Sequence, residues 1–95
     1  MRQLEKQFEG RGQVKGYSFN QITATPYGYI YAVSTKGVVG HYEVFKHLEN
    51  TLYDTVSYPT NKGFGIWAWT TPDLLKAKVI LKSIERSEIL KIEAL

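Results

Sequence analysis

Residues 63–77 read GFGIWAWTTPDLLKA, and the spacing of the apolar residues changes within this stretch. Every second residue from Phe64 to Ala68 is apolar, which is typical of a strand. A helix start signal follows, because Thr71 is a candidate N-cap and Pro72 suits the first helical position, where a missing N–H costs nothing. The stretch therefore predicts a strand that passes directly into a helix.

The predicted helix begins at Pro72 and ends near Arg86, and its apolar residues repeat at helical spacing. One arc of this helix is predicted to face the sheet and contains Leu74, Ala77, Ile80, Leu81 and Ile84. Phe64 and Ile66 on the preceding strand complete the predicted core. For the tail from Glu88 to Leu95, an edge strand and a continued helix both fit the pattern.

The upstream part of the chain alternates like a series of strands separated by turns. The predicted strands run from Val14 to Thr25, from Tyr27 to Ser34, from Val38 to Leu48 and from Thr51 to Tyr58. Turn residues separate the last three, at Thr35-Lys36-Gly37 and at Glu49-Asn50. Residues 2–9 are predicted to form either a weak helix or a disordered arm.

These elements predict a single α+β domain over residues 1–95, with residues 1–12 as a candidate flexible N-terminal arm. Its centre is an antiparallel sheet of four to five strands. One long C-terminal helix is predicted to pack on one face of that sheet.

The composition excludes several classes of function. The chain has 95 residues, no cysteine and a net charge of +3, so disulfides, thiolate nucleophiles and cysteine-bound metals are excluded. No apolar leader and no apolar run long enough to span a bilayer are present, which predicts a cytoplasmic protein that does not enter the membrane. The positive charge is mild, whereas a protein that grips nucleic acid mainly through phosphates usually shows a denser basic stripe.

The residues able to perform acid–base chemistry do not form a known catalytic motif. They are His41, Glu43, His47, Asp54 and Asp73. His41 and Glu43 lie two apart on one face of a predicted strand, but a useful metal site needs a third ligand with supporting hydrogen bonds. We therefore expect no catalytic site, no metal site and no cofactor.

The aromatic content is the unusual feature of the composition, with seven tyrosines, four phenylalanines and two tryptophans. Tyr27, Tyr29 and Tyr31 fall on one face of a predicted strand. Three roles fit these tyrosines. They can be core residues whose hydroxyls reach the rim of the sheet, a platform on which nucleic-acid bases stack, or part of a surface that binds a protein partner. The other face of the strand carries mostly small residues that let a helix approach closely, which favours exposed or partner-bound tyrosines.

Two sets of surface residues suit these alternatives. A base-stacking platform needs cations nearby, and the candidates are Lys15, Lys36, Lys46 and Lys62. A protein partner would instead cover Leu75 and Val79, which lie opposite the core arc of the predicted helix. The sequence therefore predicts a non-enzymatic binding module for single-stranded nucleic acid or, alternatively, for a protein partner or a second copy of the chain.

Three blocks of the sequence carry a first resemblance. They read GRGQVKG at 10–16, HYEVFK at 41–46, and SYPT at 57–60 running into GFGIWAWT at 63–70. Together they resemble a group of uncharacterised small proteins from gut bacteria, their phages and mobile elements. This resemblance spans most of the chain and implies a phage or mobile-element setting without an assigned activity.

A second resemblance lies in the order of three strands followed by a helix, with Phe64-Gly65 preceding TPDLLKA at 71–77. This arrangement is similar to the close of the AP2 or integrase-type DNA-binding domain. In that family the sheet enters the major groove of DNA through arginines and tryptophans on its strands. The resemblance is one of fold, and it implies a sheet face that contacts DNA.

Overall fold

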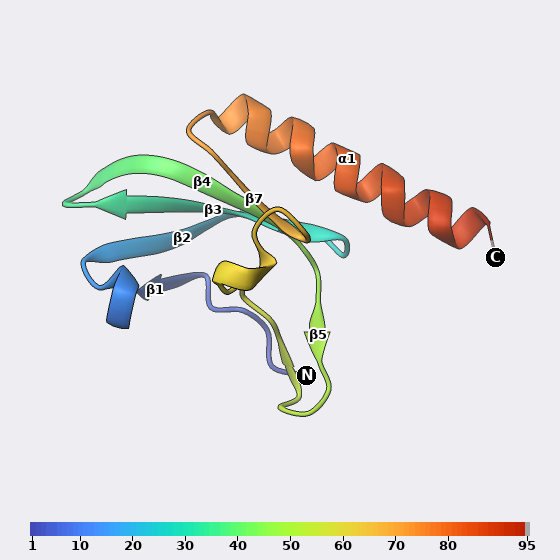
Figure 1. The fold of residues 1–95 in the computed structure, drawn as a ribbon, viewed down its shortest axis with the longest axis horizontal. Coiled ribbons are helices and arrows are strands. Elements are labelled where there is room, and N and C mark those ends of the chain that lie inside the picture. The colour runs from blue at the N-terminus through green and yellow to red at the C-terminus, as the bar shows by residue number, and fades with distance from the viewer. Residues whose placement is uncertain (95) are drawn as a thin grey trace.

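The computed structural model describes residues 1–94 and contains a five-stranded antiparallel sheet and one long helix (Figure 1). In the spatial order of the sheet, the strands are β1 (Gln7–Glu9), β2 (Tyr17–Ala24), β3 (Gly28–Thr35), β4 (Val38–Lys46) and β7 (Ala68–Thr71). Helix α1 (Leu74–Glu93) follows β7 and packs on β3, β4 and β7. The predicted α+β fold, with an antiparallel sheet and a long C-terminal helix, is confirmed.

The sheet is built around the consecutive hairpins β2-β3 and β3-β4. At the β3-β4 turn, Lys36 and Gly37 both have positive φ, at 52° and 80°. Two successive residues in the left-handed region match the right-handed twist of the two strands that they join. The hairpin predicted at this turn is therefore confirmed, and Thr35 pairs with Val38 across it.

A cluster of aliphatic side chains closes the face of the sheet toward α1. We call it the helix-side core, and its buried members are Ile30, Val44, Ala77, Leu81 and Ile84. Gly28 lets the chain pack closely here, since a Cβ at this position would lie 2.5 Å from the Phe45 carbonyl oxygen and 3.0 Å from Leu81 Cδ1. The arc of α1 predicted to face the sheet is thus the buried one, with Leu74 and Ile80 at its half-buried edges.

The opposite face of the sheet carries a second cluster, the aromatic core. Its buried members are Phe19, Tyr29, Tyr31, Val33, Phe45, Val56 and Ala68, with Leu4, Phe8, Tyr58, Phe64 and Trp67 packed against them. The cover comes from the N-terminal segment and from residues 48–67, which contain β5 (Glu49–Asn50), β6 (Thr55–Val56) and the 3-10 turn η2 (Asn61–Gly63). Both faces of the central sheet are therefore covered.

The predicted helix start is wrong, and the alternative left open for the tail is decided in favour of a continued helix. The helix begins at Leu74, and its N-cap is Asp73, whose carboxylate accepts a hydrogen bond from the Leu75 N–H at 2.9 Å. Thr71 stays in β7, where it pairs with Tyr42, so the chain needs the next two residues to turn out of the sheet before the helix starts. At the other end α1 continues to Glu93, which excludes an edge strand there; Leu95 lies outside the described residues.

The expectations for the segments before β2 and after β4 also need correction. Residues 2–9 form no helix; β1 pairs with β2, and Arg2 forms a bridge with Thr55. The strand predicted over residues 51–58 shrinks to the two residues of β6, because Asn50 Oδ1 accepts from the Tyr53 N–H at 3.2 Å and closes a turn over residues 51–54. The predicted turn Glu49-Asn50 is instead strand β5.

The strand predicted from Phe64 onward starts only at Ala68. A turn at residues 65–67 precedes it, and Ile66 there is 72% exposed, so its predicted place in the core is wrong. The turn also separates the two tryptophans. Trp67 packs against the aromatic core, whereas Trp69 packs against the helix-side core.

The observed cap gives a direct test of the helix start. Asp73→Ala is expected to lower the free energy of unfolding by about 1 kcal/mol, because the Leu75 N–H loses its acceptor. Asp73→Asn keeps a side-chain acceptor and is expected to retain most of the stability. Urea denaturation of both variants measures the difference, and equal losses would contradict the assignment of Asp73 as the cap.

Candidate functional site

The predicted base-stacking tyrosines are not exposed. Tyr29 and Tyr31 are 4% and 0% exposed and belong to the aromatic core. Tyr27 precedes β3 and packs against the helix-side core, so the three side chains do not share one face. The expectation of exposed or partner-bound tyrosines is wrong because a second layer of chain covers the sheet face away from α1.

The hydroxyls of the two buried tyrosines have protein partners. Tyr31 Oη donates to the Glu5 carbonyl oxygen at 2.6 Å and accepts from Gln21 Nε2 at 3.0 Å. Tyr29 Oη lies 2.9 Å from His47 Nδ1. Burial raises the pKa of both hydroxyls, and the negative charge of Glu49 adds to the rise of the Tyr29 pKa. Both hydroxyls therefore stay protonated at neutral pH, and both side chains are part of the packed core.

Two histidine–glutamate pairs on or next to β4 each connect to a tyrosine. His41 Nε2 lies 3.4 Å from Glu43 Oε2, and Tyr58 donates to the other oxygen of Glu43 at 2.6 Å. In the second pair, His47 Nε2 lies 3.0 Å from Glu49 Oε2 while its Nδ1 contacts Tyr29.

These chains of hydrogen bonds resemble catalytic relays in their residue types, but the tyrosines at their ends are poor nucleophiles. Burial, followed by the charge of Glu43, raises the pKa of Tyr58 far above its ordinary value. The Tyr29 pKa is raised as well, so neither hydroxyl supplies a phenolate at neutral pH. Among residues 1–94, no three His, Cys, Asp or Glu side chains gather closely enough to hold a metal ion.

The four candidate lysines are dispersed. Lys36 lies in the β3-β4 turn and Lys46 at the other end of β4, where its Nζ is 3.6 Å from Glu88 Oε1. Lys15 follows the 3-10 turn η1 (Gly12–Val14), and Lys62 lies in η2. The structure brings Lys46 and Tyr27 together, since both line one surface depression, but it does not gather the four lysines and the three tyrosines into one platform.

The helix side chains predicted to need a cover are exposed. Leu75 and Val79 are 72% and 67% exposed, and Leu90, 56% exposed, continues their stripe on the side of α1 away from the sheet. We call this stripe the outer face of α1. Leu90 belongs to the apolar tail for which the sequence left an edge strand and a continued helix open, and the continued helix places it on this stripe.

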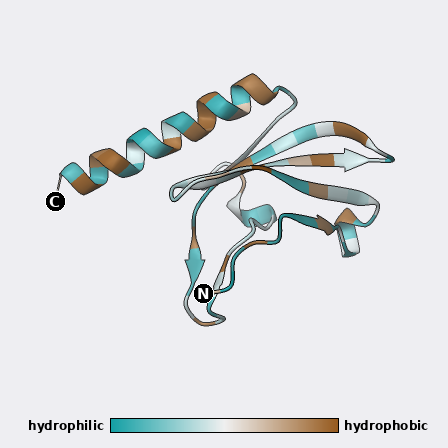
Figure 2. Cartoon of the chain, turned by 180° about the vertical axis from the view of Figure 1, so that it is seen from behind, coloured by the Kyte–Doolittle hydropathy of each residue, from teal (hydrophilic) through white to brown (hydrophobic). Residues whose placement is uncertain are grey.

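The outer face is hollowed between its apolar residues. An open depression of about 600 Å³ runs along it. Its lining is apolar at Val79, Ile89 and Leu90 and polar or charged at Lys82, Ser83, Glu85, Arg86 and Glu93. Residues spaced like Val79, Lys82, Ser83 and Arg86 form the four-residue hole that receives a side chain from a facing helix. Apolar residues occur along the whole length of α1, including the last turns, which project beyond the sheet (Figures 1 and 2).

The charges of α1 are distributed unevenly between its two halves. Residues 74–82 contain Lys76, Lys78 and Lys82 and no acidic side chain. Residues 83–93 contain three glutamates against Arg86 and Lys91, so this half is net negative. The first half of α1 is therefore net positive and the second half net negative, although Glu88 of the second half is paired with Lys46 on β4.

Comparison with protein-family models, with curated proteins and with solved structures finds no match to the chain. Within residues 1–94, no helix combines the length and the apolar composition needed to cross a membrane.

Proposed function

We propose that the protein is a non-enzymatic interaction module that forms a homodimer through the outer face of α1. The exposure of Leu75, Val79 and Leu90 on one side of a helix whose other side is already buried carries this proposal. Exposed apolar side chains gathered on one otherwise polar helix face are typical of an interaction surface. The depression beside Val79 and Leu90 would accept an apolar side chain of a second copy.

The charges of α1 favour a second copy as the partner and an antiparallel pairing of the two helices. In an antiparallel pair, the lysine-rich half of each helix faces the net negative half of the other. A parallel pair would place like charges opposite each other, which costs free energy. Either arrangement can have the two-fold symmetry of most dimers, in which the same patch is used by both subunits, so the charges alone favour the antiparallel pair.

Sedimentation equilibrium tests the dimer. The wild-type protein is expected to associate, and Val79→Glu is expected to weaken association by at least about tenfold, because an unpaired charge would be desolvated in the interface. Ile66→Glu is the matched control, since Ile66 is as exposed as Leu75 but lies in the turn before β7. A wild-type protein that remains monomeric at high micromolar concentration would overturn the proposal.

A charge exchange tests the antiparallel arrangement. Lys78→Glu and Glu93→Lys are each expected to weaken the dimer, and the double variant is expected to restore it, because the two residues lie in oppositely charged halves of α1. If the losses of dimer affinity add up in the double variant, antiparallel pairing is contradicted. The apolar contact is tested separately by Val79→Glu.

Binding to single-stranded nucleic acid, the other predicted function, stays a prediction. Its stacking platform cannot include Tyr29 or Tyr31 in this fold, because both lie in the aromatic core. Fluorescence titration with short DNA and RNA oligomers at low salt tests it. Binding that weakens steeply with added salt would support it, because counterions are released when lysines and arginines contact phosphates.

A further inference from the structure

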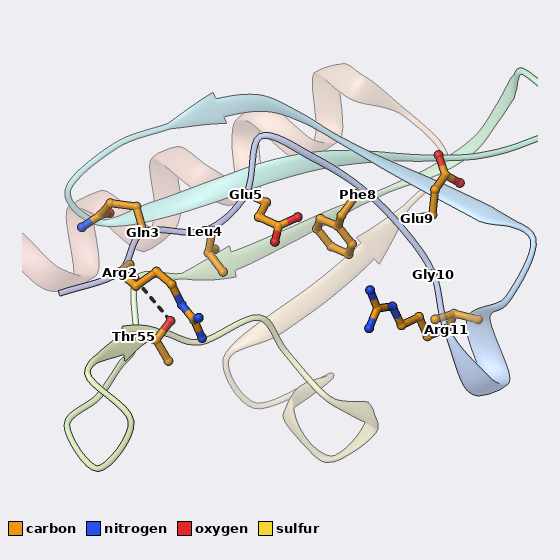
Figure 3. Close-up of a pocket in the computed structure, with 10 residues that line it drawn as sticks. Arg2, Gln3, Leu4, Glu5, Phe8, Glu9, Gly10, Arg11 and Thr55 are labelled. Atoms are coloured by element: carbon orange, nitrogen blue, oxygen red, sulfur yellow. Dashed lines mark hydrogen bonds between the residues drawn. The ribbon is translucent and has the colours of Figure 1, made fainter.

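A second surface with the features of a binding site lies on the side of the sheet away from α1. A cavity of about 810 Å³ opens there beside the N-terminal segment, the turn η1 and Thr55 (Figure 3). Leu4, Phe8 and Val14 supply its apolar lining, and Arg2 and Arg11 supply guanidinium groups. Its volume lies within the range of about 300 to 1,000 Å³ that is usual for small-molecule sites.

The apolar lining belongs to a packed cluster. The ring of Phe8 stacks on Phe19 with centroids 4.8 Å apart and an interplanar angle of 4°. Tyr58 meets Phe8 edge-on at 5.3 Å. The floor of the cavity is therefore held in place by the aromatic core before any ligand arrives, which lowers the cost of binding.

The two arginines reach into the cavity from opposite ends. Figure 3 shows both guanidinium groups pointing into the cavity. Phe8, which lies between the two arginines in the sequence, directs its ring into the same space. Within residues 1–94, neither arginine has a carboxylate at ion-pair distance. Glu9 also lines the cavity, but its carboxylate accepts a hydrogen bond from the Ser18 hydroxyl at 2.7 Å and points away from the two guanidinium groups.

The backbone fixes the place of each arginine. At Arg2, the N–H donates to the Asp54 carbonyl and the carbonyl accepts from the Val56 N–H, both at 2.9 Å. Arg11 is held by the turn η1, which folds back so tightly that a Cβ on Gly10 would lie 2.0 Å from the Val14 carbonyl oxygen. Gly12, with φ of 61°, completes this turn. The glycines of the block GRGQVKG therefore allow the tight turn that places Arg11 and Val14 at the rim of the cavity.

We propose that this cavity binds a small amphiphilic anion, with its apolar body on Leu4, Phe8 and Val14 and its carboxylate or phosphate held by a guanidinium group. The planar fork of guanidinium donors matches the oxygens of both anions. The carboxylate of Glu5 borders the middle of the cavity beside Phe8. It repels a negative charge at the middle of the ligand, so the anionic group belongs at one end, beside Arg2 or Arg11.

Octanoate, octanol and acetate are suitable probes, because together they separate the charge from the apolar body. We expect octanoate at low millimolar concentration to shift the amide signals of Gly10 and Gly12 in nitrogen–proton NMR spectra. Octanol and acetate are each expected to bind at least about tenfold more weakly, since each lacks one of the two interactions. Equal binding of octanol and octanoate, or no shift with octanoate, would overturn the proposal.

Single substitutions locate the anion. Arg11→Gln or Arg2→Gln is expected to weaken octanoate binding by about tenfold, the usual effect of removing a charge-assisted hydrogen bond. Arg86→Gln on α1 makes the same chemical change away from the cavity and is expected to leave octanoate binding unchanged. The spectrum of each variant reports directly whether it is folded. An equal loss in all three variants would show attraction by net charge alone and would overturn the site.

Discussion

Replacing Phe45 with alanine is expected to lower the free energy of unfolding by about 3 to 5 kcal/mol. Phe45 is fully buried at the centre of the aromatic core. Its ring lies 5.3 Å from that of Tyr29, 5.7 Å from that of Tyr31 and 4.8 Å from that of Tyr58. Removing it leaves a cavity between side chains that belong to both the sheet and the covering layer, so the surroundings cannot easily collapse to fill it.

Chemical denaturation measures this loss, with Leu52→Ala as the control. Leu52 is a large apolar residue in the exposed turn between β5 and β6, and its truncation is expected to change the stability little. A loss below about 1 kcal/mol for Phe45→Ala would show that the covering layer does not pack on the sheet as described.

The protein is expected to lose stability steeply as the pH rises above about 10, the ordinary pKa of tyrosine. The pKa values of Tyr29, Tyr31 and Tyr58 are all raised in the folded protein, chiefly by burial. Above pH 10 the unfolded chain releases these protons while the folded protein keeps them. The unfolded state then binds fewer protons, so the free energy of unfolding falls with increasing pH.

Urea denaturation over a series of alkaline pH values measures this dependence, and tyrosinate absorbance follows the ionisation. Tyr58→Phe is expected to reduce the steepness, although it also removes the hydrogen bond to Glu43 and lowers stability at neutral pH. Tyr53→Phe changes an exposed tyrosine and is expected to leave the steepness unchanged. Tyrosines that all ionise near pH 10 in a protein that stays folded would contradict the burial of these hydroxyls.

The elements predicted correctly are those whose pattern is local. Alternation over β2, β3 and β4, and helical spacing along α1, depend on residues a few positions apart, so the sequence alone reveals them. The predicted helix start is wrong because both Thr71 and Asp73 are good capping residues. Which of the two residues caps the helix depends on the pairing of Thr71 with Tyr42 on β4. These two residues are far apart in the sequence, so a local pattern does not reveal their contact.

The candidate sites were harder to predict because they depend on what covers a surface. Alternation correctly placed Tyr29 and Tyr31 on one face, but it could not show that Phe8 and Tyr58 pack on that face. These covering residues lie in segments with weak periodicity. The cavity between Arg2 and Arg11 was missed for the same reason, since its walls come from the N-terminal segment, a 3-10 turn and β6.

The burial of β3 on both faces has a consequence for synthesis of the chain. Seven consecutive residues from Gly28 to Ser34 are buried, and this segment contains no charged residue and no proline. Such segments pair readily with strands of other molecules when they are uncovered. The N-terminal segment that covers one face precedes β3 in the chain, but Tyr58 on that face and α1 on the other are translated later than β3. A growing chain therefore presents an aggregation-prone strand on the ribosome until its C-terminal helix is made, and a truncation before α1 would leave that strand permanently open.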